Sequence, residues 1–302
     1  LDAVLRMLST LAGGLSQGEG VTNLVLDFPD AFWEIPISPE EQRFFCATAV
    51  MQGKRKYIAF LRAAQGSRLA PLLWARLAAL VMRLTQSLFQ ADDFKLMCFV
   101  DDPLVVIKGS PYERKLKAAM VILIWEALNF KLSFNKGQLH ESVTWMRGTL
   151  SVYATCVKAK VKDAIISDIK CDLAKFASVN VISRRELHSF VGKLSHAAGL
   201  LLTMRPFMHP LWAALYSDNS AGAPPGTVWK AEVQQSLVWF QAFFSNAVVG
   251  IERIFRLDAF LRQGSVIEIG TDASPWGMGG WLSKNGAITH YFCCPVSADD
   301  EV

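Results

Sequence analysis

The chain has 302 residues, of which 52% are hydrophobic and 19% are charged, with a formal net charge of +4. This length and composition exclude an intrinsically disordered protein and predict roughly two or three compact units. The most apolar stretch, residues 69–89, contains Arg76 and Arg83, and guanidinium groups are costly in the middle of a bilayer, so we expect no transmembrane helix and no membrane partner.

The six cysteines are scattered or adjacent, form no Cys-x-x-Cys pair and have no histidine at zinc-ligand spacing. The pattern predicts neither a disulfide framework nor a zinc site and favours reduced thiols in an intracellular protein of the cytoplasm or nucleus. We also expect no secretory signal, because no positively charged leader with a small-residue cleavage site is evident.

In the first half of the chain, short β-rich runs alternate with helical segments. The predicted elements are strands at 21–26, 44–50 and 56–61, a helix at 69–89, strands at 95–100 and 104–108, and a helix at 112–128. The strands at 95–100 and 104–108 form a predicted hairpin with a tight turn at Asp101-Asp102-Pro103.

The second half begins with β-rich pieces up to residue 157 and becomes helical from residue 161 to about residue 244, with a break at Pro224-Pro225-Gly226. After Gly264, residues 266–271, 277–283 and 287–292 predict an antiparallel meander.

Basic residues outnumber acidic ones between residues 151 and 210. The basic residues are Lys158, Lys160, Lys162, Lys170, Lys175, Arg184, Arg185, Lys193 and Arg205, and the acidic ones are Asp163, Asp168, Asp172 and Glu186. This surplus suits a surface that contacts nucleic-acid phosphates, and it also suits an ordinary solvated helix face. The residues by themselves leave both interpretations open.

Three carboxylates stand at the ends of apolar strands. Asp27 closes the first strand, and Asp101 and Asp102 lie at the tip of the hairpin. Acids held close together repel one another unless a divalent cation neutralises them, and Mg²⁺ suits oxygen ligands and phosphate. If strand and hairpin are neighbours in one sheet, the acids can hold two metal ions about 3.5–4 Å apart, a spacing used in phosphoryl transfer. An Asp-Asp pair alone is more typical of an ordinary turn.

Five segments resemble, in order, the motifs of reverse transcriptases. They are residues 26–37 (LDFPDAFWEIPI, first palm motif), 64–67 (AQGS, Gln-Gly motif), 99–102 (FVDD, catalytic hairpin), 128–136 (LNFKLSFNK, fourth motif) and 145–148 (WMRG, primer-gripping turn). Their order, more than any single motif, carries the resemblance, which covers roughly residues 20–155.

The resemblance implies an RNA-directed DNA polymerase that extends a primer on an RNA or DNA template with dNTPs. It implies Asp27, Asp101 and Asp102 as catalytic residues and as ligands of two Mg²⁺ ions, for which Mn²⁺ can substitute. The implied substrate contacts are Phe28, Phe32, Gln65, Gly66 and Lys136.

Two of these contacts have a physical reason within the resemblance. Phe32 falls at the position where the family places its sugar-selecting aromatic residue. A bulky ring there crowds a 2′ hydroxyl and favours deoxynucleotides. The alternative is that Phe32 is an ordinary core phenylalanine. Lys136 is implied to neutralise or protonate pyrophosphate, with a surface lysine as the alternative. For Lys54, Arg55 and Lys56, contact with phosphate and a plain solvated turn are equally open.

Two later segments add to the resemblance. Residues 184–199 with Arg205-Pro206-Phe207 resemble the thumb of retroelement polymerases, especially the DIRS-like and pararetroviral branches. Residues 269–281 resemble the opening strand pair of a ribonuclease H domain, with Asp272 as its first metal-binding carboxylate. We find no helix and strand after it to supply further acids, and do not take Asp299, Asp300 and Glu301 as replacements, so we expect this segment to be inactive. His188, His196 and His209 are expected in packing or on the surface.

We therefore predict an α+β fold of the right-hand polymerase type. Its parts are partial fingers and palm at 1–157, a helical thumb or connection at 158–262 and a truncated ribonuclease H-like β-meander at 263–302. About twenty residues precede the first motif, so the fingers are expected to be short. The functions left open are an RNA-directed DNA polymerase of a retrotransposable element, a non-catalytic nucleic-acid-binding remnant of one, and an RNA-directed RNA polymerase, against which Phe32 and the ribonuclease-like tail argue. The oligomeric state is left open.

Overall fold

The computed structural model describes residues 1–146, 148–217, 222–245 and 251–296. The chain folds as two compact units, Leu1–Leu257 and Asp258–Val302. Within the described ranges, no helix has both the length and the apolar character needed to cross a membrane.

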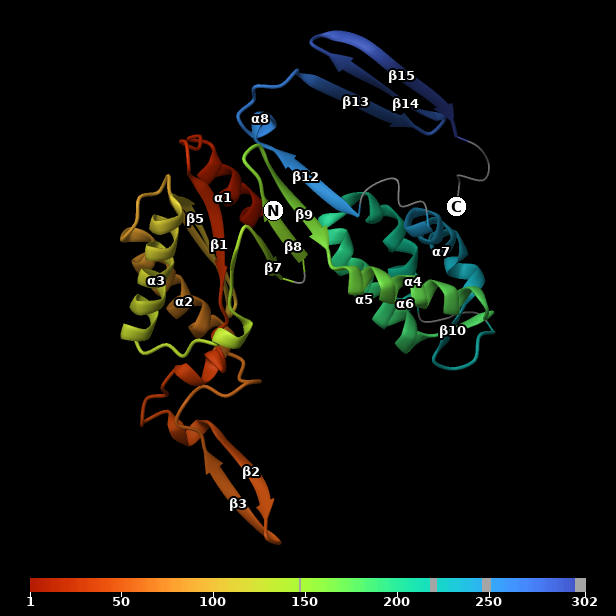
Figure 1. Cartoon of the computed structure of the whole chain (residues 1–302). Coiled ribbons are helices and arrows are strands. Elements are labelled where there is room, and N and C mark those ends of the chain that lie inside the picture. Colours follow the sequence, from red (N-terminus) through yellow and green to blue (C-terminus); the bar gives the residue numbers. More distant parts are fainter. Residues whose placement is uncertain (147, 218–221, 246–250, 297–302) are drawn as a thin grey trace. The chain divides into compact units, whose positions relative to one another are not determined.

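A four-stranded antiparallel sheet, here called the central sheet, forms the middle of the first unit (Figure 1). Its strands, in spatial order, are β4 (Phe94–Phe99), β5 (Asp102–Gly109), β1 (Gly20–Val25) and β6 (Gln138–His140). Strand β5 is buried along nearly its whole length because both faces of the sheet are covered. This explains why its sequence is an unbroken apolar run.

Helices cover both faces of the central sheet. They are α1 (Asp2–Leu11), α2 (Ala70–Ser87) and α3 (Pro111–Ala127). Helices α2 and α3 pack on one face through a core that includes Trp74, Trp125 and Phe28, while α1 packs on the other face (Figure 1). The alternation of side chains along β1 and β5 supplies both cores, since successive residues of a strand point to opposite faces.

A two-stranded hairpin, β2 (Cys46–Met51) and β3 (Lys54–Ala59), projects from the same unit (Figure 1). It is rooted in the segment after β1, which contains the 3₁₀ turns Ala31–Glu34 and Gln42–Phe44. Backbone hydrogen bonds tie the root together, from Ile37 N–H to the Leu61 carbonyl (3.0 Å) and from Ala63 N–H to the Ile35 carbonyl (2.9 Å).

A second antiparallel sheet follows the central one. Its strands, in spatial order, are β12 (Glu252–Arg256), β9 (Cys156–Val161), β8 (Gly148–Val152) and β7 (Ser142–Trp145). The inner face of this sheet packs with α1 and one face of the central sheet. The predicted boundary between residues 157 and 158 falls inside β9, whose partner β12 comes from almost a hundred residues later in the sequence.

The rest of the first unit is a helical layer with its own core, which includes Phe176, Phe190 and Phe240. Its helices are α4 (Asp163–Ala177), α5 (Arg184–Leu200), α6 (His209–Tyr216) and α7 (Lys230–Ser245), and a short ribbon joins β10 (Val181–Ser183) to β11 (Thr227–Trp229). Turns of 3₁₀ helix lie at Phe134–Lys136, Leu202–Met204 and Pro206–Met208. This confirms the predicted helical character of the region.

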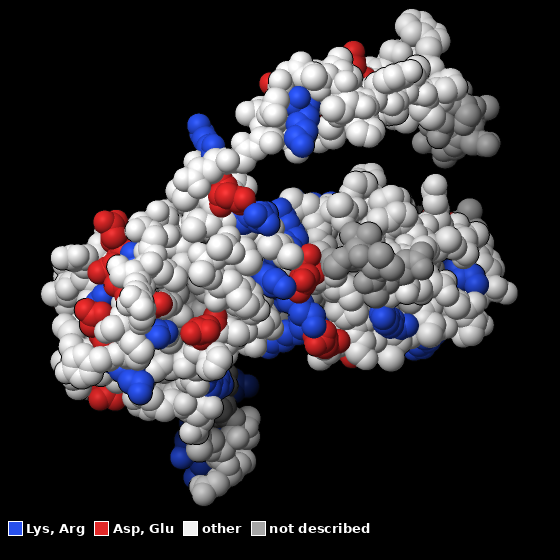
Figure 2. Space-filling view, turned by 45° about the horizontal axis from the view of Figure 1, so that its top comes forward, with Lys and Arg blue, Asp and Glu red and all other residues white. Residues whose placement is uncertain are grey.

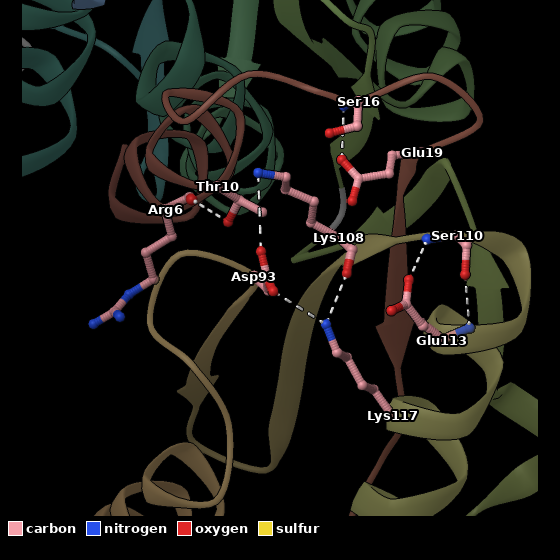
Figure 3. A network of polar contacts seen from close by, with 9 residues as sticks. All are labelled: Arg6, Thr10, Ser16, Glu19, Asp93, Lys108, Ser110, Glu113 and Lys117. Atoms are coloured by element: carbon pink, nitrogen blue, oxygen red, sulfur yellow. Dashed lines mark hydrogen bonds and ion pairs between the residues drawn. The ribbon is translucent and has the colours of Figure 1, made fainter.

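A polar network fixes the far end of the central sheet (Figure 3). Buried Lys108 of β5 reaches Asp93 (3.9 Å), and Lys117 of α3 contacts both Asp93 (3.6 Å) and the Lys108 carbonyl (3.0 Å). Beside it, Ser110 and Glu113 form a reciprocal capping box at the start of α3. The box satisfies N–H groups that the first turn of a helix leaves without partners.

The second unit begins in α8 (Leu257–Phe260) and contains the meander β13 (Ile267–Ser274), β14 (Gly277–Lys284) and β15 (Ala287–Pro295). The predicted meander is therefore confirmed. Asn285 and Gly286 both have positive φ angles, as the two-residue turn between β14 and β15 requires. Glycine is needed at 280, since a Cβ there would lie 2.4 Å from the Phe292 ring.

One predicted turn was wrong. The hairpin turn consists of Val100 and Asp101, whereas Asp102 and Pro103 belong to β5 and pair with Phe99 and Cys98. Val100 makes the turn by adopting a φ of 56°, an uncommon angle for a β-branched residue. Pro103 is tolerated because it stands near the start of its strand, where fewer ladder hydrogen bonds are required.

Candidate catalytic site

The register of the central sheet brings the predicted acids together. Strands β1 and β5 are antiparallel neighbours with Val25 opposite Leu104, and continuing this register places Asp27 opposite Asp102. The Phe28 N–H donates to the Asp101 carbonyl at 3.1 Å, so the pairing does continue past the end of β1. The expectation that the first strand and the hairpin lie side by side is confirmed.

Asp27 and Asp102 line a pocket of about 550 Å³, here called the acid pocket. Its other lining residues are Val25, Leu26, Phe99, Lys136, Gln138, Thr144, Trp145, Met146, Lys162 and His196. The Lys136 ammonium lies 2.6 Å from Asp27 Oδ2. Lys136 is positioned there because its 3₁₀ turn is tied to the end of β1 by a hydrogen bond from Ser133 N–H to the Asp27 carbonyl (3.0 Å).

Titration at the site reflects crowded negative charge. Partial burial raises the pKa of Asp102, and the nearby carboxylates of Asp101 and Asp27 raise it further, while Lys136 acts in the opposite direction. The pKa of Lys136 is raised by its hydrogen bond to Asp27 and by the charge of that carboxylate. Burial, followed by the charges of Asp101 and Asp102, raises the pKa of the Cys98 thiol to about 12. The pocket thus favours an added positive charge.

Hydrogen bonds from the core fix the turn at Val100, between β4 and β5. The Val100 carbonyl accepts a hydrogen bond from the indole N–H of Trp74 at 2.6 Å and one from the Cys98 thiol at 3.3 Å. Trp74 is buried in α2 and its ring meets the Phe28 ring edge-on, with centroids 5.7 Å apart. Trp74 therefore contacts both chain segments that supply the acids. The sequence contained no signal for this role, because Trp74 reads as one more apolar position of a helix.

The opposite wall of the acid pocket comes from the second sheet and the helical layer. Trp145 donates from its indole N–H to the Asp102 carbonyl at 3.1 Å. Met146 follows it with a φ of 47° and also lines the pocket, while the Arg147 of the same predicted motif lies outside the described residues. Lys162 and His196 complete the wall. The sequence predicts His196 in packing or on the surface; it reaches the pocket because α5 packs against Val161 at the end of β9.

The predicted substrate contacts divide into two groups. Lys136 lies in the acid pocket, but Phe28 does not: its side chain is 2% exposed and packs against Trp74, Trp125 and Phe130. The Phe28 ring is therefore a core side chain, because the residue after Asp27 points into the core under the sheet, and the expected substrate contact of Phe28 stays a prediction.

The remaining predicted contacts lie outside the described lining of the acid pocket. Phe32 is half-buried against the core of α2 and α3. Gln65 and Gly66 are exposed in the loop before α2, where Gly66 has a φ of 87° and open space around it. In the second unit, Asp272 is exposed on β13 beside a hollow formed with Gly279, Gly280 and Trp281.

Four of the nine basic residues between residues 151 and 210 form ion pairs, three of them with acids of the same segment. Ion pairs join Lys175 to Glu186, Lys193 to Asp172 (2.8 Å), Lys160 to Asp163 (2.9 Å) and Lys158 to Glu252 (3.8 Å). Red surface accordingly lies beside blue in the middle of Figure 2. These contacts favour the solvated-face interpretation for the four paired lysines, while Lys162 lines the acid pocket.

The residue types of the site suit a divalent cation, but their present arrangement does not form a metal site. Carboxylate oxygens are the ligands that Mg²⁺ prefers. The pKa of Asp102 is raised by burial and then by the charges of Asp101 and Asp27, and a bound cation would offset both effects. However, Asp27 Oδ2 is engaged by Lys136, and in the described part of the chain no group of three or more His, Cys, Asp or Glu side chains is arranged to hold a metal ion.

Comparison with known proteins agrees with this geometry. Residues 11–150, just under half of the chain, match the family described as "Reverse transcriptase (RNA-dependent DNA polymerase)". This segment contains the central sheet and the three acids of the first strand and the hairpin, so the similarity to this family falls on the part of the first unit that forms the acid pocket. No curated protein matches the sequence.

Two solved structures of a foamy viral protease-reverse transcriptase are similar in fold. One is a complex with an RNA/DNA hybrid (TM-score 0.54) and the other a complex with double-stranded DNA (TM-score 0.57); each is 16% identical in sequence. Both matches cover 97% of this chain, which spans only 35% and 45% of the two viral chains. The likeness shows a mixed α/β fold resembling that of a viral reverse transcriptase.

Proposed function

We propose that this chain is the polymerase core of a retrotransposable element, an RNA-directed DNA polymerase that extends a primer on a nucleic-acid template with dNTPs. The observation that carries the proposal is the convergence of Asp27, Asp101 and Asp102 at one end of the central sheet, beside a pocket that Lys136, Lys162 and His196 also line. The match of residues 11–150 to the reverse transcriptase family supports it.

In this proposal, Asp27, Asp101 and Asp102 would hold two Mg²⁺ ions, for which Mn²⁺ can substitute. The metal ions would lower the pKa of the attacking 3′ hydroxyl and neutralise charge on the leaving pyrophosphate. Lys136 would leave Asp27 and turn its ammonium to the phosphates, where it can donate a proton to the leaving group. A side chain that is 72% exposed has the freedom to make this exchange.

The remaining roles concern the substrate. Phe32 would limit the space beside the sugar and favour deoxynucleotides, and Gln65 with Gly66 would contact the incoming nucleotide, with glycine allowing close backbone approach. Met146 and Lys162 would face the primer strand, because they line the pocket opposite the acids. For the second unit, we propose a ribonuclease H-like meander in which Asp272 is the first metal-binding carboxylate.

The test is primer extension on poly(rA)/oligo(dT) with Mg²⁺ or Mn²⁺, comparing the chain with an Asp101→Asn, Asp102→Asn variant. Extension that depends on the metal and is lost in the variant is the expected result. Equal incorporation by both proteins would contradict the proposed mechanism.

A second candidate, a non-catalytic nucleic-acid-binding remnant, is favoured by one observation: the Lys136 ammonium occupies the Asp27 oxygen that a metal ion would need. Binding of a primer-template without extension, at any concentration of Mg²⁺ or Mn²⁺, would support this candidate over the polymerase.

A further inference from the structure

Strand β4 forms one edge of the central sheet, and half of its backbone groups point away from the sheet. The Lys108 N–H donates to the Asp93 carbonyl at 2.8 Å, which fixes the alternation of the ladder between β4 and β5. Every second residue, counted from Asp93, bonds to β5. Phe94, Leu96 and Cys98 therefore turn their backbone N–H and carbonyl groups outward.

Side chains of α2 close the two ends of this edge. Gln86 Nε2 donates to the Phe94 carbonyl at 2.9 Å, and the Trp74 indole N–H donates to the Val100 carbonyl at 2.6 Å, just beyond the strand. Between these two contacts, the outward backbone groups of the other two strand residues have no hydrogen-bond partner in the described part of the chain. The buried Gln86 Oε1 lacks a donor as well. The middle of the edge is therefore free to pair.

A groove of about 620 Å³, here called the edge groove, lies along this part of β4. Leu96 belongs to the core with α2 and Met97 packs on the core with α1, so the edge runs between the two helices. The α2 wall of the groove carries Ala75, Ala78 and Ala79, whose small side chains leave space beside the strand. The groove is therefore open to an added strand, which would lie about 4.8 Å from β4.

Positive charge surrounds the edge groove. Arg6 of α1 and Arg83 of α2 line it, and neither forms an ion pair in the part of the chain that the structure describes. Figure 3 shows the Arg6 guanidinium extending away from the polar network, while the Arg6 backbone carbonyl accepts from Thr10. Asp2 is the one acid among the described lining residues, and Lys95 of β4 adds a positive charge at the edge. This surplus favours an occupant with negative side chains.

The unpaired backbone groups distinguish between possible occupants. A nucleic-acid backbone offers acceptors but no N–H donors, so it would leave the carbonyls of Leu96 and Cys98 without partners. A second copy that paired through its own β4 would bring Lys95, Arg6 and Arg83 against the same three cations, and such charges oppose edge-to-edge pairing. An extended peptide supplies donors and acceptors at the spacing that the edge requires.

We propose that the edge groove binds an extended acidic segment of a partner protein, which adds a strand to the central sheet at Leu96 and Cys98. Backbone hydrogen bonds would form at both residues, and the acidic side chains would face Arg6 and Arg83. The edge groove and the acid pocket share no described lining residue, and the proposal does not depend on the polymerase function.

The probe is a set of fluorescein-labelled pentapeptides of the form Val-Glu-Val-Glu-Val, with Val, Ile, Thr or Phe at the odd positions. Fluorescence anisotropy measures their binding to the whole chain. A second set has Lys in place of Glu and should bind about tenfold more weakly. Two N-methylated forms of the best binder carry methyl groups at either the odd or the even residues. Only one of them should lose binding, because the N–H groups of an added strand face the sheet at every second residue.

Protein variants locate the site. The Arg6→Gln, Arg83→Gln variant should weaken binding of the acidic peptide about tenfold at low salt, whereas Arg76→Gln, on the same helix as Arg83 but outside the groove, should bind like the wild type. Ala79→Trp fills the groove and should also weaken binding about tenfold. Its control is Leu80→Trp, at an exposed neighbouring position that does not line the groove. Circular dichroism checks that all four variants are folded.

Amide hydrogen exchange, followed by NMR, gives a second readout in the unaltered chain. Without peptide, the N–H groups of Leu96 and Cys98 should exchange faster than those of Lys95 and Met97, which bond to β5. Saturating acidic peptide should slow exchange at Leu96 and Cys98 about tenfold and leave the other two unchanged.

Failure of every acidic peptide to bind at about 1 mM would overturn the proposal, as would equal binding of the lysine set or equal effects of the groove and control variants. Competition between oligo(dT) and the peptide would assign the groove to nucleic acid instead. A dimer in light scattering that Ala79→Trp dissociates would assign it to a second copy. Either result would also overturn the proposal. Primer extension enters none of these measurements, so failure of the polymerase function would leave the outcome unaffected.

Discussion

The indole N–H of Trp74 donates a 2.6 Å hydrogen bond to the carbonyl oxygen of Val100, the residue that makes the strained turn before Asp101 and Asp102. A buried helix side chain thereby fixes the backbone of the acid hairpin. Strained backbone persists only where its surroundings determine it, and such strain is concentrated at functional sites. The contact connects the core formed with α2 and α3 to the turn that carries the proposed catalytic acids.

Replacing the Trp74 donor should lower kcat for primer extension while changing the stability of the fold little. Trp74→Phe keeps an aromatic ring and removes the N–H, a loss of about 1 kcal/mol that corresponds to about a fivefold lower kcat for primer extension with little change in KM. The matched control is Trp125→Phe, because Trp125 is equally buried, also packs on Phe28 and donates to Thr85 Oγ1 (2.9 Å), away from the hairpin. Equal kcat values for the two variants would argue against a positioning role.

Lys136, which the proposal moves from Asp27 to the leaving group, should matter for chemistry and not for binding. Lys136→Met should lower kcat at least tenfold, about 1.4 kcal/mol in the barrier, while the affinity for a primer-template changes less than twofold. Lys131→Met is the control, since Lys131 is as exposed as Lys136 and pairs with Glu34 (3.6 Å). Comparable losses in both variants would show that general charge, and not the proposed action of Lys136 on the leaving group, is responsible.

The thiol of Cys98 should report the charge of the hairpin. Its pKa is raised to about 12 by burial and by Asp101 and Asp102, so it should react with iodoacetamide far more slowly than exposed Cys46 at pH 8. Removing the two negative charges in the Asp101→Asn, Asp102→Asn variant should lower this pKa and speed alkylation of Cys98 at pH 9–10. Peptide mass spectrometry gives both rates, and an unchanged rate at Cys98 would contradict the electrostatic cause.

The capping box of α3 should make stability depend on pH. Hydrogen bonds from Ser110 lower the pKa of Glu113 in the folded state. A lowered carboxyl pKa stabilises the fold above the unfolded pKa, and this contribution is lost as the pH falls through the folded pKa. Glu113→Gln should therefore flatten the fall in unfolding free energy below about pH 4.5.

Ser110 itself should contribute at every pH. Ser110→Ala should lower the unfolding free energy by about 1 kcal/mol at pH 7, because the helix loses its N-cap acceptor. Urea titrations of both variants at several pH values test the pair, and parallel curves for Glu113→Gln and the wild type would rule out the linkage.

The local elements of this protein follow from its sequence. Alternating and continuous apolar runs at residues 21–26, 69–89 and 104–108 predicted β1, α2 and β5 to within a few residues. The sequence placed the acids at strand ends and made their meeting conditional on the first strand and the hairpin being neighbours in one sheet, a condition that the register of β1 and β5 meets. Short-range periodicity and turn chemistry are sufficient for conclusions of this kind.

Other features were decided only by tertiary structure. One of the two partners of β9 is β12, far along the chain, and no local pattern selects a strand at that distance. Phe28 turned into the core, His196 reached the acid pocket, and Trp74 bonded to Val100 because packing between separate segments, and not their own propensities, sets these orientations. The sequence determined which residues are able to do the chemistry, while the meeting of distant segments decided which of them surround the acids.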